Sequence, residues 1–132
     1  MSYSIRLYTP TDYPMILSWW LAQKEPGPTQ DMLPQTTVIV EDAGIPILCH
    51  SLILTNVKAF AYVAFLIGNP SVKGKQKAVE FLMEYWKVVA RERGYNRLLT
   101  FPHKEKVKAL YESYGFKKTI GDITGYALEV GE

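Results

Sequence analysis

Two hydrophobic periods alternate along this chain, and they predict strands and helices in turn. Alternating or β-branched apolar stretches predict strands, bounded by turn signals such as Asp42-Ala43-Gly44. Apolar residues spaced by three and four predict helices, and the clearest of these stops at Gly94. The predicted strands are 4–8, 36–41, 45–54, 59–67, 97–101, 116–120 and 124–130; the predicted helices are 11–22, a stripe over 78–89, and 104–114.

The order of these elements, β-α-β-β-β-α-β-α-β-β, predicts an α+β fold. Three consecutive strands joined by short turns imply antiparallel pairing. The long helix between two apolar strands implies a right-handed crossover and therefore a central parallel strand pair. We expect a mixed, mostly antiparallel twisted sheet with helices on both faces. A chain of 132 residues without repeats or linkers fits a single domain, 1–132.

Composition narrows the class of protein. Hydrophobic residues make up 48% of the chain and aromatic residues 13%, which excludes intrinsic disorder. The single cysteine, Cys49, excludes a disulfide scaffold and suits a reducing compartment. No apolar run approaches the ~20 residues of a membrane span, and the first residues lack the layout of a signal peptide. These features predict a soluble cytoplasmic protein with no membrane partner.

The net charge of +2 conceals a basic segment. Between Lys73 and Lys118, 12 lysines and arginines face 5 acids, a local charge of +7, while the rest of the chain carries −5. Such a segment favours an anionic partner: a phosphorylated cofactor, a nucleic acid or an acidic surface. Surface helices often carry lysine without any such partner, so this alternative stays open.

A loop at 67–78 joins an apolar strand to the long helix. Such a junction presents free backbone N–H groups and the positive end of a helix to an anion. Glycine permits close approach of the main chain, and Lys73, Lys75 and Lys77 add charge. The sequence therefore predicts a phosphate-binding loop, with an ordinary solvated strand-to-helix loop as the alternative.

The order of elements and two motifs resemble the GNAT family of acyl-CoA-dependent N-acyltransferases. The family's loop reads Pro-x-x-Arg-Gly-x-Gly-x-Gly/Ala, and this chain has Pro70, Lys73, Gly74, Gln76 and Ala78 at those positions. Lysine thus replaces arginine, and glutamine replaces the central glycine. The side chain of that glutamine crowds a position where the family brings backbone close to phosphate, or donates a hydrogen bond of its own.

The second motif lies on the last predicted helix. The stretch Leu110-Tyr111-Glu112-Ser113-Tyr114-Gly115-Phe116 is similar to the family's Leu-Tyr-Glu-Lys-x-Gly-Phe segment. Lys104 and Val107 stand where the family usually has asparagine and alanine. The resemblance covers nearly the whole chain in element order.

The resemblance implies a binding mode for coenzyme A. Pantetheine would lie where the strand before the loop and the strand from Arg97 splay apart, and would pair with the backbone as an added strand. The loop N–H groups would hold the pyrophosphate. The residues so assigned to the cofactor are Leu66, Ile67, Gly68, Lys73, Gly74, Lys75, Gln76, Lys77, Ala78 and Lys104.

The resemblance also assigns chemistry. Tyr111 stands where the family places the proton donor to the departing thiolate, and a backbone N–H near Leu66 or Ile67 would hold the oxyanion. A packed core tyrosine is the alternative for Tyr111. No general base is evident, because the strand 59–67 has no carboxylate. The candidates elsewhere are His50, His103, Glu41 and Asp42.

Other chemistry-bearing residues predict structural roles. Cys49 and His50 are neighbours that point to opposite faces of a strand, so Cys49 is expected in the core. No cluster has metal-ligand spacing, so we expect no metal. One of Trp19 and Trp20 is expected near the loop 24–34, which in GNAT proteins helps to shape the acceptor pocket; an exposed tryptophan or a homodimer contact is the alternative.

The resulting hypothesis is an N-acetyltransferase that moves an acetyl group from acetyl-CoA to a primary amine of a small molecule, peptide or protein. Its rival is a non-catalytic GNAT-like module whose basic face binds nucleic acid or another anionic partner. The altered glycine, the missing strand carboxylate and the lysine-rich helices all favour that rival.

Overall fold

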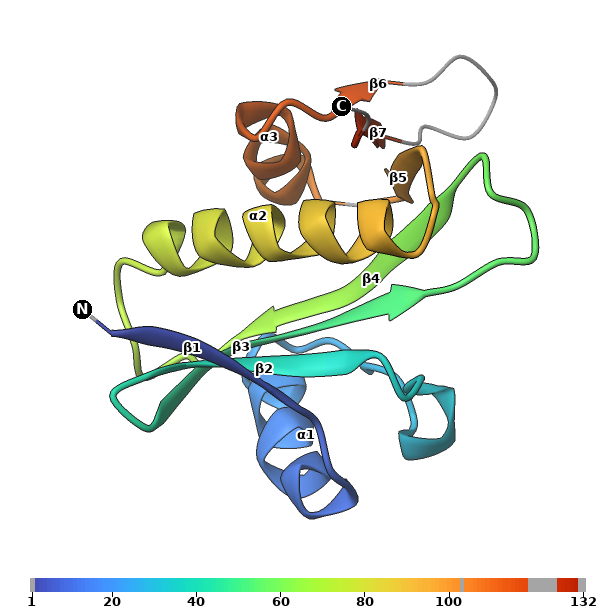
Figure 1. Ribbon diagram of the computed structural model, residues 1–132. Coiled ribbons are helices and arrows are strands. Elements are labelled where there is room, and N and C mark those ends of the chain that lie inside the picture. The colour runs from blue at the N-terminus through green and yellow to red at the C-terminus, as the bar shows by residue number, and fades with distance from the viewer. Residues whose placement is uncertain (1, 103, 119–125, 131–132) are drawn as a thin grey trace. The chain divides into compact units, whose positions relative to one another are not determined.

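The computed structural model describes residues 2–102, 104–118 and 126–130 (Figure 1). Two compact parts can be described one at a time. The first unit comprises the described residues of Met1–Leu52 together with Phe65–Leu82. The second unit comprises Ile53–Ala64 and the described residues of Met83–Glu132. The prediction of a single domain over 1–132 stays a prediction.

The elements follow the predicted order closely. The strands are β1 (Tyr3–Leu7), β2 (Thr37–Asp42), β3 (Ile45–Ile53), β4 (Ala61–Gly68), β5 (Arg97–Thr100), β6 (Lys117–Lys118) and β7 (Tyr126–Glu129). The helices are α1 (Tyr13–Ala22), α2 (Gln76–Glu92) and α3 (Glu105–Ser113), with short 3₁₀ helices η1 (Pro10–Asp12) and η2 (Gln30–Met32) that the sequence pattern did not predict.

Strand pairing confirms the expected fold class. Among the described strands the order in the sheet is β1-β2-β3-β4-β5-β7-β6. The β1–β2, β2–β3, β5–β7 and β6–β7 pairs are antiparallel, and β4–β5 is parallel. The central position of β4, between β3 and the strand near Leu98, is therefore confirmed. The residues 119–125, with the predicted turn at Gly121-Asp122, lie outside the described part of the chain.

The hairpin between β2 and β3 forms where the turn signal predicts it. Ala43 and Gly44 both have positive φ, 51° and 85°. Two successive left-handed residues form the tight turn whose twist matches that of antiparallel strands. The pairs Asp42↔Ile45 and Glu41↔Pro46 close the hairpin, and a register irregularity follows between Val40 and Glu41.

Helix α1 and the beginning of α2 cover the two faces of the strands in the first unit (Figure 1). On one face, Ile16 and Trp19 of α1 form a buried cluster with Ile39, Cys49 and Ile67. Residues that alternate with these along the strands point to the other face, where α2 begins. The expectation that Cys49 belongs to the core is confirmed.

The loop after α1 packs against Trp20. Gly27 has a φ of +62°, and a Cβ at this position would lie 2.6 Å from the Trp20 Cγ. Only glycine fits both the backbone conformation and the space. Trp20 is therefore the tryptophan beside the loop 24–34, whereas Trp19 is buried in the α1 cluster.

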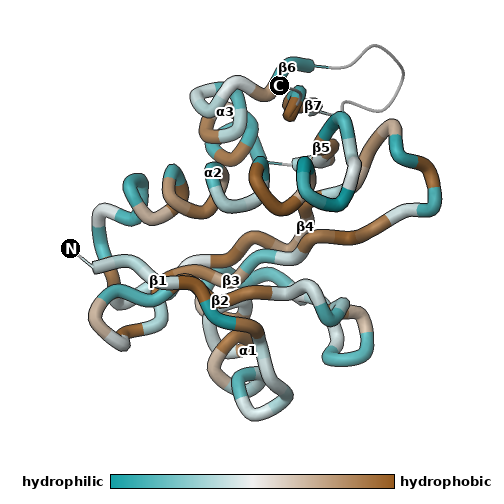
Figure 2. Tube along the Cα trace, viewed as in Figure 1, coloured by the Kyte–Doolittle hydropathy of each residue, from teal (hydrophilic) through white to brown (hydrophobic). Residues whose placement is uncertain are grey.

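Helix α2 is amphipathic along its length, with apolar and polar residues alternating along the tube (Figure 2). It ends at Glu92, and Gly94, with a φ of +83°, turns the chain back. The Tyr95 N–H then donates to the Ala90 carbonyl at 2.9 Å. This is the glycine-terminated helix end that the sequence predicts. No described helix is both long and apolar enough to cross a membrane.

The second unit holds the parallel pair and α3. The parallel ladder joins Ala61 to Leu98 and Tyr62 to Leu99. The chain turns after α3 at Gly115, where φ is +93°, and the Phe116 N–H donates to the Tyr111 carbonyl at 3.1 Å. The buried residues of this unit include Ala61, Val63, Trp86, Ala90, Tyr95, Leu98, Thr100, Tyr111, Phe116, Tyr126, Leu128 and Val130.

Candidate functional site

The parallel ladder of β4 stops early. Its described pairs with β5 end at Tyr62↔Leu99, although β4 continues to Gly68. Within this strand Phe65 has a φ of +61°, a left-handed conformation that a bulky residue rarely adopts. Such an irregularity bends a strand and ends regular pairing. Backbone groups of β4 beyond the ladder are the ones that the resemblance assigns to pantetheine.

The loop after β4 is organised around Asn69. Its backbone N–H donates to the Ile47 carbonyl at 2.8 Å, and its side-chain amide donates to the Pro46 carbonyl at 2.9 Å. The Asn69 side-chain oxygen accepts from the Ser71 N–H at 2.9 Å, and its carbonyl accepts from the Val72 N–H at 3.1 Å. These four bonds fix the loop to β3 and fold it into a tight turn.

Lys75 bends back onto this loop. Its ammonium group donates to the carbonyls of Asn69 at 3.0 Å and Val72 at 2.6 Å. Its methylene stem crosses Gly68 so closely that a Cβ there would lie 2.6 Å from the Lys75 Cε. The sequence pattern assigns the charge of Lys75, with that of its neighbours, to a phosphate. In the structure its ammonium group instead bonds to carbonyls within the loop.

The remaining predicted loop residues present a different surface. Lys73, Gln76 and Lys77 are exposed, and Gly74 has a φ of +71°. The exposed residues lie at the N-terminal end of α2, where backbone N–H groups and the helix dipole favour an anion. Ala78 belongs to α2 and is fully buried, so its side chain is not placed to contact a ligand.

The assigned residues of β4 divide between core and loop. Ile67 is buried in the α1 cluster, Leu66 is half-buried, and Gly68 lies beneath Lys75. Within the first unit the structure therefore brings Gly68 and Lys75 together, directly beside the Asn69 turn. The assignment of these residues to coenzyme A stays a prediction.

Tyr111 is a buried residue of the second unit. Its ring meets that of Phe116 edge-on with centroids 5.0 Å apart. Burial raises the pKa of Tyr111 to about 12, and a side-chain hydrogen bond with Thr100 partly opposes this shift. The phenol therefore stays protonated at neutral pH, the state that a proton donor needs. Its predicted role involves the loop of the first unit as well, and stays a prediction.

Lys104 precedes α3 and is exposed. Its carbonyl accepts from the N–H groups of Val107 at 3.1 Å and Lys108 at 2.9 Å, so its backbone caps the helix while its side chain faces solvent. The exposure of Lys104 is compatible with its assignment to the cofactor.

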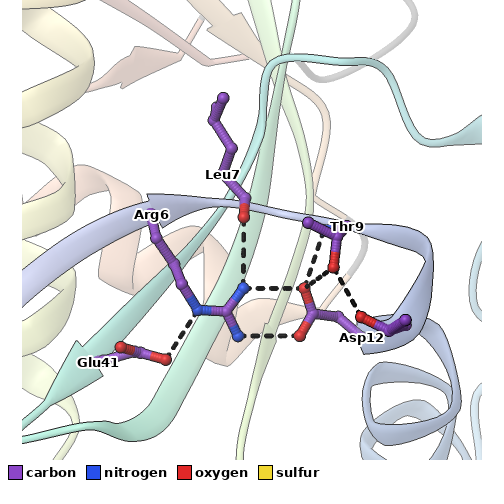
Figure 3. A network of polar contacts seen from close by, with 6 residues as sticks. Arg6, Leu7, Thr9, Asp12 and Glu41 are labelled. Carbon is purple, nitrogen blue, oxygen red and sulfur yellow. Dashed lines mark hydrogen bonds and ion pairs between the residues drawn. The ribbon is translucent and has the colours of Figure 1, made fainter.

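Each described candidate for the general base has a structural role. His50 is completely buried, and burial lowers its pKa to about 3. Glu41 accepts a hydrogen bond from the Arg6 Nε at 2.8 Å (Figure 3). Asp42 accepts from the Ser2 N–H at 3.0 Å. His103 lies outside the described residues.

The Arg6 network holds the chain where β1 leads into α1. The Asp12 carboxylate makes no side-chain cap on α1, but it belongs to a capping box with Thr9 at the start of η1. It accepts from the Thr9 N–H at 2.9 Å and from Arg6 through two parallel bonds at 2.8 and 2.9 Å (Figure 3). The Arg6 guanidinium lowers the pKa of Asp12 because it favours the charged carboxylate.

Among the described residues, neither Cys49 nor a cluster of metal-ligating side chains offers further chemistry. Burial raises the pKa of the Cys49 thiol to about 12, so the thiolate needed for nucleophilic attack does not form near neutral pH. Over the described ranges, no group of three or more histidines, cysteines and carboxylates could hold a metal ion.

The sequence pattern does not identify two residues of these sites, Asn69 and Thr100. Asn69 reads as an ordinary turn residue, although an asparagine directly after a strand is a signal for a turn that bonds its own backbone. Thr100 reads as a strand residue, and no local pattern links it to Tyr111, eleven positions later.

Solved structures that share this fold include N-acetyltransferases. N-acetylglutamate synthase from Neisseria gonorrhoeae, complexed with coenzyme A and N-acetyl-glutamate, superposes with a TM-score of 0.81 at 15% identity over 100% of this chain and 36% of that one. Ard1 from Thermoplasma volcanium gives 0.80 at 15% identity over 100% of both chains. The ribosomal-protein-S18-alanine N-acetyltransferase from Escherichia coli gives 0.73 at 16% identity over 99% of this chain and 96% of that one.

These likenesses establish the fold. No protein-family model matches the chain, and no curated protein matches it. The chain spans about a third of the length of the N-acetylglutamate synthase chains. It therefore has the GNAT fold, as the two sequence motifs predict.

Proposed function

We propose that this protein is an N-acyltransferase that transfers an acetyl group from acetyl-CoA to a primary amine. The observation that carries the proposal is the early end of the β4–β5 ladder, at Tyr62↔Leu99, in a strand that leads directly into a lysine-rich loop and a helix. A strand edge beyond the end of its ladder suits an extended amide-bearing chain such as pantetheine. The acetyltransferase neighbours, two of them complexed with coenzyme A, support the same function.

The loop residues fit a pyrophosphate. Gly74 adopts the left-handed conformation in open space, so the backbone beside it is accessible to a ligand. Lys73 and Lys77 are exposed and flank the start of α2. Cations and helical N–H groups that converge on one place form an anion site. These groups would bind the phosphates and thereby fix the position of the acyl end.

Bound acetyl-CoA supplies an acetyl thioester, and the residues of the chain would assist its reaction with an amine. A backbone N–H near Leu66 or Ile67 would donate to the carbonyl oxygen as negative charge develops there. Tyr111 would give its proton to the departing thiolate sulfur. The amine loses a proton to water as the C–N bond forms, because β4 carries no carboxylate.

A direct experiment tests this function. Isothermal titration of coenzyme A measures binding, and release of free thiol from acetyl-CoA measures transfer to a panel of small amines, peptides and protein N-termini. We expect micromolar binding and thiol release that depends on one class of amine. Absence of coenzyme A binding at millimolar concentration would contradict the proposal.

The departure of the loop from the family's pattern favours a second function. Lys75 bonds to carbonyls of its own loop, and Gln76 replaces the family's central glycine, so the loop departs from the usual cradle. A non-catalytic module with this fold would use its basic segment to bind nucleic acid or another anion. Salt-sensitive binding to DNA or RNA, without coenzyme A binding, would favour this function.

A further inference from the structure

Lys75 differs in its surroundings from the lysines on either side of it. Lys73 and Lys77 are exposed, whereas Lys75 is half-buried and its ammonium group lies against two carbonyl oxygens. A lysine ammonium has three donors, and two of them are committed to Asn69 and Val72. Hydrogen bonds from a charged donor are about twice as strong as neutral ones, so this geometry resists rearrangement.

The stem of Lys75 occupies the space that a side chain at position 68 would need. Its Cε and Cδ lie 2.6 and 2.9 Å from the position of a Cβ on Gly68, and Leu48 of β3 closes the same space at 3.5 Å. A residue with any side chain at position 68 would displace the lysine. Gly68 and Lys75 therefore form a matched pair, in which the missing side chain makes room for the stem.

The carbonyls that Lys75 binds belong to the turn that shapes the loop. The Asn69 carbonyl accepts from both Lys75 and the Val72 N–H, and the Asn69 N–H and side chain anchor the same turn to β3. Lys75 is the residue directly before α2. Its side chain thus links the end of β4 to the start of α2, where the helical N–H groups would face an anion.

We propose that Lys75 is a positioning residue that braces the phosphate loop before coenzyme A binds, rather than a direct phosphate ligand. This inference rests on the proposed function and reassigns one residue within it. The brace holds the carbonyls of Asn69 and Val72 away from the anion site and keeps the loop in its binding shape. Ligand binding then requires less ordering of the loop, which increases affinity.

The test compares variants that remove the ammonium, the stem or the space for it. Lys75→Met keeps most of the stem and removes the charge. The control Lys87→Met removes the same charge from another half-buried lysine, which lies on α2 and pairs with Glu84 at 3.4 Å. Gly68→Ala displaces the stem, and Gly68→Ala with Lys75→Ala asks whether the two positions are coupled. Titration of coenzyme A and of acetyl-pantetheine, which lacks the pyrophosphate, measures binding to each folded variant.

We expect Lys75→Met and Gly68→Ala each to weaken coenzyme A binding by about tenfold or more, since each loses charge-assisted bonds. Acetyl-pantetheine binding should change by less than about twofold, as should coenzyme A binding to Lys87→Met. In a protein that already carries Lys75→Ala, the further change Gly68→Ala should weaken coenzyme A binding only slightly. Hydrogen exchange of segment 69–75 in the ligand-free Lys75→Met protein should accelerate.

Other results would overturn the brace. Equal coenzyme A affinity of Lys75→Met and Lys87→Met excludes any role of Lys75 in binding. If Lys75→Met binds coenzyme A weakly while Gly68→Ala binds it as tightly as the wild-type protein, Lys75 contacts the phosphate directly. Unchanged exchange of the loop in ligand-free Lys75→Met excludes bracing independently of any ligand. A wild-type protein that does not bind coenzyme A contradicts the proposed function. If hydrogen exchange is still accelerated in Lys75→Met, Lys75 stabilises the loop but has no link to the cofactor, and the proposal is overturned in that part.

Discussion

Acidification should destabilise this protein through His50. The imidazole is 0% exposed, and burial lowers its pKa to about 3 because the charged form is excluded from the core. In the unfolded chain a histidine has a pKa of about 6.5. Between these values the unfolded chain binds a proton that the folded protein does not. The free energy of unfolding contributed by His50 is therefore complete above pH 6.5 and is lost as the pH falls toward 3.

The magnitude follows from the two pKa values. Each pH unit within the window costs about 1.4 kcal/mol, so His50 alone should lower the free energy of unfolding by about 2 kcal/mol between pH 7 and pH 5. Urea unfolding followed by tryptophan fluorescence measures this quantity at both pH values. His50→Asn is the matched variant, because an amide is neutral throughout. All other titrating groups, Asp12 among them, are common to both proteins.

The test compares how much the free energy of unfolding changes with pH in each protein, so the absolute stability of His50→Asn does not affect it. Wild-type protein should lose about 2 kcal/mol more than His50→Asn between pH 7 and pH 5. Equal losses would refute the burial argument. So would a pH–activity profile with an acidic limb near pH 6.5 that disappears in His50→Asn, since that limb belongs to a solvent-accessible base.

Three further predictions concern the site and its support. Tyr111→Phe should lower turnover by about 10²–10⁴-fold with little change in coenzyme A affinity, because a proton donor acts as the thiolate leaves; wild-type turnover would make Tyr111 a core residue only. Lys73→Glu with Lys77→Glu should weaken coenzyme A binding, measured by titration, by about 2 kcal/mol or more, and unchanged affinity in the folded variant would refute the anion site. Gly27→Ala should lower the free energy of unfolding, measured in urea, by about 1–3 kcal/mol more than Gly44→Ala does. Both glycines have positive φ, but only Gly27 faces a tryptophan ring. Equal losses of stability in the two variants would exclude the steric contact.

Local signals predicted most of the fold. The hairpin turn before Gly44 and the helix ends at Gly94 and Gly115 were all predicted from sequence, because each requires a left-handed residue that glycine readily supplies. The parallel pair followed from the long helix between two apolar strands. The turns and helix ends depend on residues within a few positions of one another, and the crossover depends on the order of the elements; a single sequence displays both.

Side-chain partners were harder to predict, because they depend on contacts made through the fold. The Asp12 carboxylate belongs to a local capping box with Thr9, but its bonds from Arg6 on β1, and the bond from Arg6 to Glu41, depend on the fold. His50 and Tyr111 read as candidate catalysts, and the structure shows that both are buried. Burial and long-range pairing decide such roles, and neither follows from local pattern.

The loop shows how a motif can change without losing its shape. In the stretch that matches the family's motif, 70–78, the left-handed backbone requires glycine at one position, Gly74, where φ is +71°. Gln76 already belongs to α2, where helical backbone accepts any residue but proline readily, so its replacement of the family's central glycine puts no strain on the chain. What the substitution alters is the surface offered to the anion. The shape itself depends on Gly74, on the Asn69 turn and on Lys75.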